Sequence, residues 1–123
     1  MNNNVFLDQA KFMLAAEQSV GVFNEDQLSL YLELIQEEVH EMKESIENKD
    51  YVNLLKELND IIVVVSGAIW SLDCDPEDAW NEVVRSNMSK VDPEVGKIVK
   101  RDDGKVLKPS TYSPADVSKF IRV

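Results

Sequence analysis

Cysteine, proline and glycine are scarce in this chain of 123 residues, which contains one cysteine, four prolines and four glycines. The single cysteine, Cys74, excludes an intrachain disulfide and a zinc site built mainly from thiolates. So few helix-breaking residues in a chain that is 44% hydrophobic exclude fibrous and disordered classes and favour a helix-rich folded protein. At this length the chain has room for one hydrophobic core.

A long hydrophobic run is also lacking. The longest apolar stretch, residues 61–69, is interrupted by Ser66 and Gly67 and is far shorter than the roughly 20 residues that a membrane span needs. Residues 1–4 lack the basic segment and apolar stretch of a secretory signal. We therefore expect no membrane association and a cytoplasmic location.

Basic residues are few over most of the chain. Residues 1–89 hold 18 acids and 5 bases, a net charge of −13, whereas residues 90–123 hold 5 acids and 8 bases, a net charge of +3. Because binding to a polyanion depends on basic residues that displace its counterions, this distribution argues against nucleic acid as a partner. The acidic part should attract cations instead.

Four segments carry apolar residues at helical spacing. The β-branched run 61–65 would suit a strand, but the helical stripe continues through it without a turn signal, so it is predicted to be helical. We expect the third helix to be the centre of the core. The expected bounds are about 5–18, Asn24 or Asp26 to about Asn48, Asp50 to about Leu72, and Pro76 to Ser89 or Lys90.

A basic tail follows the helices. Residues 97–100 and 105–108 flank residues 101–104, which end in the Asp-Gly pair typical of a tight hairpin turn, and Ser113-Pro114 predicts a short final helix. The fold class is therefore all-α, a four-helix bundle over residues 1–90 with a β-hairpin-like tail over residues 91–123. Partner subunits could complete the core of so small a bundle.

Carboxylates are concentrated on the second and third helices. Glu38 and Glu41 share one helix face, as do Glu57 and Asp60, because each pair is three residues apart. Packed antiparallel across a short connection, the two faces would meet, and a cation would be needed to offset the repulsion. Hard oxygen ligands suit Mg²⁺ or Mn²⁺. An ordinary solvated face, with Asp60 as a hydrogen-bonded core acid, is the alternative.

These residues resemble a known family. The letters EEVHE, followed by ELND, are similar to the EExxE, spacer, ExxD signature of the MazG-like all-α nucleoside triphosphate pyrophosphohydrolases, over about residues 30–90. The resemblance implies that Glu38, Glu41, Glu57 and Asp60 bind Mg²⁺, with Mn²⁺ as a substitute. It also implies that Glu37 is an additional ligand or positions the attacking water.

The resemblance extends into the tail. Asn87-Met88-Ser89-Lys90, with the basic segments downstream that include Lys97, is similar to the tails of phage and bacterial MazG-like proteins. Asn87 and Lys90 lie one turn apart at the end of the fourth helix, where an amide and an ammonium can hold phosphate oxygens. A surface pair that merely ends the helix is the alternative. Asn87, Lys90 and Lys97 are therefore candidate substrate-binding residues.

Other chemistry-bearing residues favour structural roles. His40, the only histidine, lies between motif glutamates, but a lone histidine on a charged face is more often solvent-exposed than a ligand. Cys74 lacks a histidine base at a recognisable spacing, so water is the better nucleophile. Trp70 and Trp80 lie at helical spacing within apolar stripes, which favours packing over stacking on a nucleobase.

The implied function is Mg²⁺-dependent hydrolysis of a nucleoside triphosphate to the monophosphate and pyrophosphate by metal-activated water. Residues 1–90 would form the catalytic domain of a homodimer or homotetramer, in which the first helix or the tail contributes to the neighbouring subunit's site. Within this class, the tail also suits a relative that acts on phosphoribosyl-ATP. A function of another class is a non-catalytic acidic helical interaction module.

Overall fold

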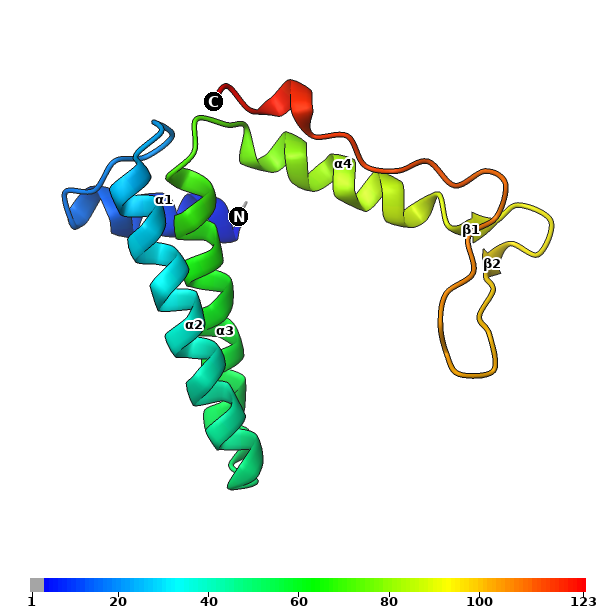
Figure 1. Cartoon of the computed structure of the whole chain (residues 1–123), viewed down its shortest axis with the longest axis horizontal. Coiled ribbons are helices and arrows are strands. Elements are labelled where there is room, and N and C mark those ends of the chain that lie inside the picture. The colour runs from blue at the N-terminus through cyan, green and yellow to red at the C-terminus, as the bar shows by residue number, and fades with distance from the viewer. Residues whose placement is uncertain (1–3) are drawn as a thin grey trace. The chain divides into compact units, whose positions relative to one another are not determined.

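The computed structural model describes residues 4–123, which are mostly helical (Figure 1). An all-α fold with a small two-stranded C-terminal sheet is therefore confirmed. None of the described helices is both long and apolar enough to cross a membrane. Residues 1–3, on which the expectation about a secretory signal partly rests, lie outside the described residues. The elements are α1 (Val5–Ala15), α2 (Glu25–Glu47), α3 (Tyr51–Trp70), α4 (Pro76–Met88), β1 (Val91–Asp92), β2 (Lys97–Ile98) and the 3-10 helix η1 (Ser118–Phe120).

Side-chain caps set the starts of α2 and α3. Asn24 Oδ1 accepts a hydrogen bond from the Gln27 amide at 3.0 Å, and Asp50 Oδ1 accepts one from the Asn53 amide at 3.0 Å. Each cap satisfies a backbone donor that the first helical turn leaves without a partner. Both caps were among the expected helix starts. The first helix ends earlier than the expected residue 18, because Glu17 adopts a positive φ of 59° that a right-handed helix cannot continue.

The chain divides into two compact units. The first unit runs up to Pro76 and takes in the last three residues, Ile121–Val123, so it contains α1, α2 and α3. The second unit is Glu77–Phe120, which holds most of α4 and the tail. Each unit is described by itself.

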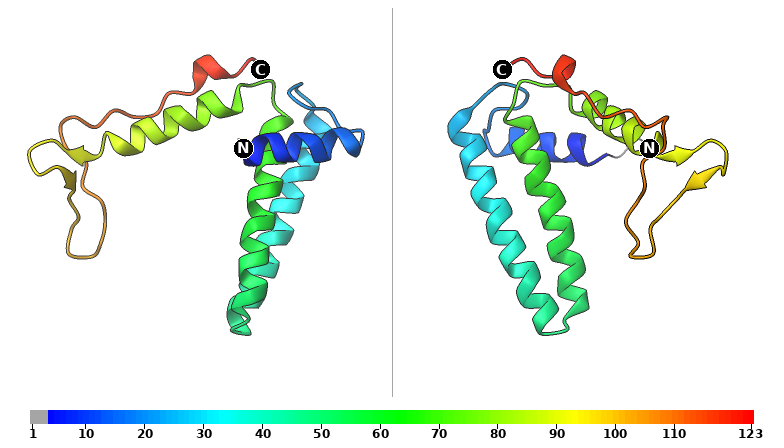
Figure 2. Two further views of the ribbon diagram at one scale, coloured as in Figure 1. Left: turned by 180° about the vertical axis from the view of Figure 1, so that it is seen from behind. Right: turned by 45° about the vertical axis from the view of Figure 1, so that its right-hand side comes forward.

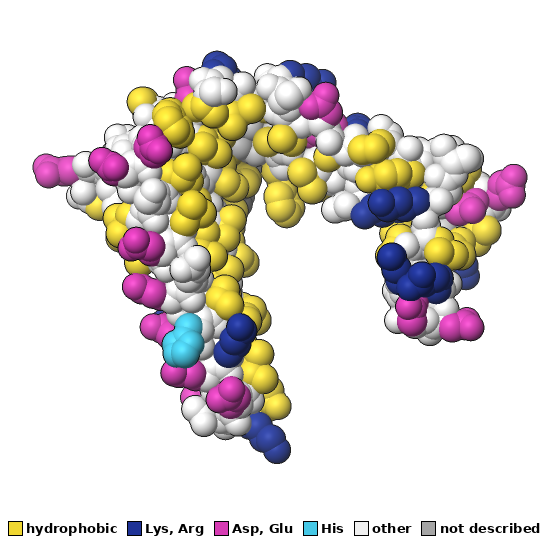
Figure 3. Space-filling model, in the orientation of Figure 1, with side chains coloured by type: hydrophobic (Ala, Val, Ile, Leu, Met, Phe, Trp, Pro, Cys, Tyr) yellow, Lys and Arg dark blue, Asp and Glu magenta, His cyan; other side chains and the backbone are white. Residues whose placement is uncertain are grey.

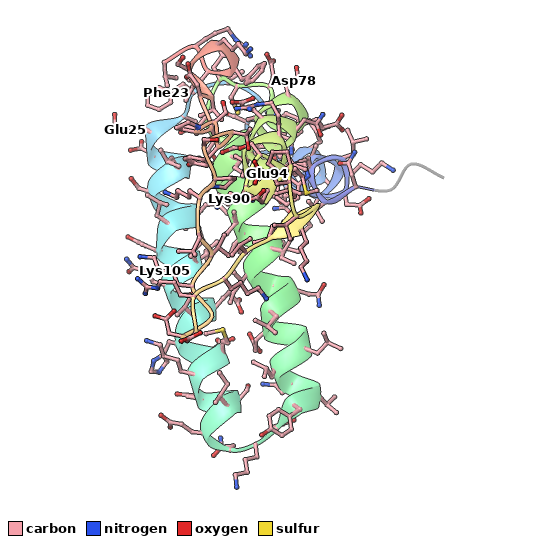
Figure 4. All side chains as sticks on the ribbon, turned by 90° about the vertical axis from the view of Figure 1, so that its right-hand side faces the viewer. Phe23, Glu25, Asp78, Lys90, Glu94 and Lys105 are labelled. Carbon is pink, nitrogen blue, oxygen red and sulfur yellow. The ribbon has the colours of Figure 1, made fainter. Side chains whose placement is uncertain are left out.

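An antiparallel hairpin of α2 and α3 is the centre of the first unit. The two helices run side by side along their whole length, from the end where Glu25 lies to the loop of residues 48–50 (Figure 4). Helix α1 crosses the hairpin near the end away from that loop (Figure 2). The buried core is formed there by one residue from α1, one from α2 and two from α3, namely Met13, Tyr31, Val64 and Ala68.

A glycine lets α2 and α3 approach closely within this core. A Cβ atom on Gly67 would lie 2.2 Å from a ring carbon of Tyr31, so only glycine leaves room for the ring. The Tyr31 hydroxyl, buried with the ring, accepts a hydrogen bond from Gln9 Nε2 at 3.3 Å and donates one to Gln18 Oε1. This aromatic residue therefore links the α2–α3 contact to the first helix and to the residues that follow it.

The opposite side of α3 is not covered within the described chain. Seven large apolar side chains recur along its outer face, so α3, although it supplies two of the four core residues, is buried on one side only in the single chain. Apolar side chains follow the α3 edge of the hairpin and acidic ones follow the α2 edge (Figure 3). The exposed large apolar residues of α3 are Tyr51, Val52, Leu55, Leu58, Ile62, Val63 and Val65.

In the second unit, the tail forms two consecutive turns. Strands β1 and β2 pair antiparallel, with Val91 opposite Ile98 and Asp92 opposite Lys97. The predicted Asp-Gly turn follows, closed by a single bridge between Lys100 and Val106. The two-residue ladder thus lies upstream of the predicted hairpin, and the final helical turn is η1 rather than a helix starting at Ser113.

The C-terminus folds back onto the α3–α4 connection within the first unit. Cys74 and Ile121 form an isolated antiparallel bridge, and the Arg122 amide donates to the Asp73 carbonyl at 2.8 Å. The Arg122 guanidinium pairs with Asp73 at 2.8 Å and contacts both carboxylate oxygens of Asp75 at 3.1 Å. Such a two-pronged contact fixes the arginine more firmly than a single ion pair does.

Candidate active site

The register of the α2–α3 hairpin decides which carboxylates meet. Gln27 Nε2 donates to Ser71 Oγ at 2.9 Å near one end of the hairpin, and Asn53 Nδ2 donates to Ser45 Oγ at 2.7 Å near the other. Equal steps along the two antiparallel helices from these pairs bring position 41 level with position 57, and position 38 level with position 60. The end of the hairpin that is far from α1 is therefore lined by acidic and amide side chains instead of the apolar core.

Three carboxylates converge at this end. One oxygen atom each from Glu38, Glu41 and Glu57 lies within 4.8 Å of the other two. Glu57 is 4% exposed, Glu38 is half-buried and Glu41 is exposed, so the cluster runs from the helix interface outward. Three negative charges at such separations repel strongly where water is excluded, and the cluster requires a compensating proton or cation.

Two carboxylate oxygens of the cluster are buried without a hydrogen-bond partner among the described residues, Glu38 Oε2 and Glu57 Oε2. A buried carboxylate oxygen without a partner is costly, and such groups are rare in folded proteins. Both atoms belong to hard oxygen donors of the kind that Mg²⁺ and Mn²⁺ accept. The donor set therefore fits a divalent cation.

The pKa values of the three carboxyl groups reflect the same crowding of negative charge. A hydrogen bond with Glu57, followed by burial and the charges of Glu41 and Asp60, raises the pKa of Glu38 to about 7. The same bond lowers the pKa of Glu57, because a protonated Glu38 donates to the Glu57 carboxylate. Contact with Glu57 also raises the pKa of Glu41. Without a cation, the cluster thus retains a proton on Glu38 close to neutral pH.

A comparison with protein families decides the class of the protein. The family described as phosphoribosyl-ATP pyrophosphohydrolase matches residues 12–87, more than half of the chain and the whole α2–α3 hairpin. The chain belongs to this family. The family is part of the MazG-like all-α nucleoside triphosphate pyrophosphohydrolase superfamily, so the general activity is that of a pyrophosphohydrolase. A search of curated proteins finds no match.

Asp60 is the fourth acid of the EExxE–ExxD motif. It lies beside the three-carboxylate cluster but is not one of the residues whose oxygen atoms lie within 4.8 Å of one another. Its side chain is 35% exposed, and its Oδ2 accepts a hydrogen bond from Lys56 Nζ at 2.7 Å. Lys56 Nζ also lies 3.4 Å from Glu57 Oε1. The one sequence signal for Lys56 is its position four residues before Asp60, which is the spacing of a helical ion pair.

Glu37 and His40 lie on the outer face of α2. Glu37 is exposed and borders a shallow surface depression together with Glu33 and His40, on a face that includes Glu41. Glu37 is therefore not brought into the three-carboxylate group. His40 has a side chain that is 74% exposed and lies 3.0 Å from Glu44, which agrees with the expected solvent exposure.

A polar cleft of about 310 Å³ continues from the cluster toward the α2–α3 loop. Its wall includes Ser45 and Asn53, whose hydrogen bond joins the two helices, and the Ser45 hydroxyl donates to the Glu41 carbonyl at 3.2 Å. These two residues lie one turn beyond Glu41 and one turn before Glu57. That spacing was the signal that could have identified them.

The candidate phosphate-binding residues all lie in the second unit. Lys90 Nζ donates to Asn87 Oδ1 at 3.2 Å, so the structure brings this predicted pair together at the end of α4. The Lys90 ammonium also lies 6.0 Å from the centre of the Tyr112 ring, and the Lys108 ammonium lies 4.8 Å from it. Lys97 is exposed on β2, opposite Asp92.

The tryptophans take different positions. Trp70 packs against the core cluster, and its indole Nε1 donates to the Phe6 carbonyl at 2.7 Å, as a packing role predicts. Trp80, in α4, is 59% exposed. The packing expected for this second indole is therefore not found among the described residues.

Proposed function

We propose that the protein is a magnesium-dependent pyrophosphohydrolase that converts a nucleoside triphosphate to its monophosphate and pyrophosphate. The observation that supports this proposal best is the meeting of Glu38, Glu41 and Glu57 around two buried oxygen atoms that lack hydrogen-bond partners. This meeting lies inside the region matched by a pyrophosphohydrolase family. An acidic surface without catalytic function would not need to bury Glu57.

The proposed ligands of the divalent ion are Glu38, Glu41, Glu57 and Asp60, with Mn²⁺ as a possible substitute for Mg²⁺. When bound, the ion would supply positive charge to the phosphates and would acidify the attacking water. Glu37 is proposed as an additional ligand or a group that positions this water, which requires its exposed side chain to turn toward Glu41. Residues 1–90 are proposed as the catalytic part.

Asn87, Lys90 and Lys97 are proposed to bind the phosphates of the substrate. The ammonium groups can donate charge-assisted hydrogen bonds to phosphate oxygens, and Asn87 orients the ammonium of Lys90 through the bond between them. A cationic tail also complements the anionic substrate. Water adds to one of the two phosphorus atoms of the anhydride that joins the monophosphate to the pyrophosphate, and the P–O bond from that phosphorus to the bridging oxygen breaks. The bridging oxygen leaves with the other phosphate group, so the products are the monophosphate and pyrophosphate.

Phosphoribosyl-ATP is the alternative substrate, because the matching family is described by that activity. This compound and ordinary nucleoside triphosphates share the triphosphate on which the carboxylate site would act. The two proposals therefore differ in the nucleobase-proximal part of the substrate and not in the chemistry.

Turnover assays with a panel of substrates test the proposed function. Pyrophosphate release should occur with Mg²⁺ from at least one ordinary or modified nucleoside triphosphate or from phosphoribosyl-ATP, and EDTA should abolish it because the phosphates and water then lack the ion. Preferential hydrolysis of phosphoribosyl-ATP would select the alternative substrate. Inertness toward the whole panel would contradict the enzyme and favour an acidic interaction module.

We also propose that the protein is a homodimer or homotetramer. The support is the exposed apolar face of α3, where Val52 is 86% exposed and Leu55 is 64% exposed. Contiguous apolar surface of this kind is unusual on a monomer and typical of a subunit interface. Light scattering should give at least twice the chain mass of 14.0 kDa, and a monomeric mass at micromolar concentration would contradict the proposal.

A further inference from the structure

One lysine is in contact with the carboxylate cluster. Lys56 Nζ donates to Asp60 Oδ2 at 2.7 Å and lies 3.4 Å from Glu57 Oε1. The lysine side chain is 65% exposed, whereas the side chain of Glu57 is 5% exposed. An ammonium that reaches from solvent to a buried carboxylate differs from the ordinary surface ion pair, in which both partners are hydrated.

The surroundings of Lys56 show why its charge is held there. Hydrogen bonds to Asp60 and then to Glu57 raise the pKa of Lys56 to about 12. The charge of Lys56 in turn acts against the increase in the pKa of Glu41. Among the described residues, Lys56 is the base whose ion pairs reach this group of acids. It therefore neutralises part of the charge that the three carboxylates and Asp60 bring together.

We propose that Lys56 is the counter-cation of the metal-free site and that a divalent ion displaces it. This inference rests on the proposed metal site, because Glu57 and Asp60 would then be ligands of the divalent ion as well as partners of the Lys56 ammonium. The ammonium holds the two carboxylates in place while the site lacks an ion, and it must release at least Asp60 when the ion arrives. Lys56 thus lowers the affinity for the ion and preserves the folded hairpin without it.

Competition between the Lys56 ammonium and a divalent ion predicts in which direction the affinity for the ion changes when Lys56 is replaced. If Lys56 is replaced by neutral glutamine, repulsion between its ammonium and the arriving ion disappears, and no ion pair has to be broken. The affinity for a divalent ion should therefore rise, by about tenfold for a charge at such a short distance. The same change leaves the carboxylates without their counter-charge when no ion is present, so the metal-free protein should melt at a lower temperature.

The test uses the full chain and Mn²⁺ alone, without nucleotide, titrated at fixed ionic strength with free Mn²⁺ measured by electron paramagnetic resonance. Lys56→Gln should bind Mn²⁺ about tenfold more tightly than the unmodified protein. Lys56→Arg keeps the charge and should restore weaker binding. The matched control is Lys43→Gln, which removes the same charge two residues from Glu41 but breaks no ion pair with the cluster; it should change the affinity less than twofold.

Melting temperatures and lysine signals provide a second readout. The melting temperature of Lys56→Gln should be lower in EDTA than that of the unmodified protein, and Mn²⁺ should raise it by a larger amount. In nuclear magnetic resonance spectra of the unmodified protein, diamagnetic Mg²⁺ should shift the Lys56 side-chain ammonium and leave Lys43 unchanged. Equal or weaker Mn²⁺ binding by Lys56→Gln overturns the role of Lys56 alone. Failure of the unmodified protein to bind Mn²⁺ overturns the metal site and this inference with it.

Discussion

Glu38→Gln should abolish turnover while leaving the metal-free protein folded. The substitution removes one negative charge from the proposed ion site without changing side-chain volume, so the loss should come from the ion and not from packing. Turnover should fall by at least about 100-fold, because residues that only orient metal ligands already cost about 10- to 100-fold. Pyrophosphate release and circular dichroism measured on the same preparation check both parts.

The stability of Glu38→Gln as a function of pH provides the control. In the metal-free protein the pKa of Glu38 is raised from 4.5 to about 7, so the folded state binds a proton that the unfolded state has already lost. This contribution to stability is fully present below pH 4.5 and is lost as the pH rises through about 7. In EDTA, the melting temperature of the unmodified protein should fall across this window, and Glu38→Gln should show a smaller fall. Full activity of the variant would refute Glu38 as a ligand.

Gly67→Ala should destabilise the α2–α3 hairpin, although alanine is the better helix former. In an open helix position this change gains about 1 kcal/mol, whereas overpacking a filled core costs about 1–3 kcal/mol. The added Cβ would lie 2.2 Å from the Tyr31 ring, a residue that is 3% exposed and held at its hydroxyl by Gln9 and Gln18. Chemical denaturation should therefore give a lower free energy of unfolding.

A double-mutant cycle separates the ring contact from backbone effects. In a Tyr31→Leu background, where the ring is absent, Gly67→Ala should cost much less or become stabilising. The coupling between the two positions should be large, because they touch directly. An equal cost in both backgrounds would show that the close approach of α2 and α3 does not depend on Gly67.

Much of the helical fold could be predicted because its signals are local. Asn24 and Asp50 cap helices through their own side chains, and Pro76 starts α4 because proline suits the first helical turn. The β-branched run 61–65 is helical because it lies within the continuous helix α3, whose buried Val64 packs in the core with Tyr31 of α2, so tertiary contacts outweigh its strand preference. The end of α1 depended on the positive φ of Glu17, for which glutamate carries no local signal.

The candidate site was less predictable where it depends on packing. Residues three apart on one helix must share a face, so Glu38 and Glu41 could be expected to act together. Which acid would be buried could not be predicted, because the burial of Glu57 depends on the distance between α2 and α3. The ion pair between Lys56 and Asp60 and the hydrogen bond between Ser45 and Asn53 likewise depend on side-chain rotamers, which the sequence does not specify. The sequence left open whether a partner subunit completes the core, and it could not assign the outer face of α3 to such an interface because an apolar pattern does not distinguish a core from a subunit interface.

The contacts of Arg122 and Ile121 hold the two ends of the segment 77–120 close together in space. The chain leaves the first unit after Pro76 and returns to it at Ile121. The bridge between Cys74 and Ile121 keeps these two positions next to each other. Residues 77–120 are thus inserted into the first unit like a cassette, with both ends anchored at one place. A short spliced linker could replace this cassette without stretching the backbone that carries the carboxylates.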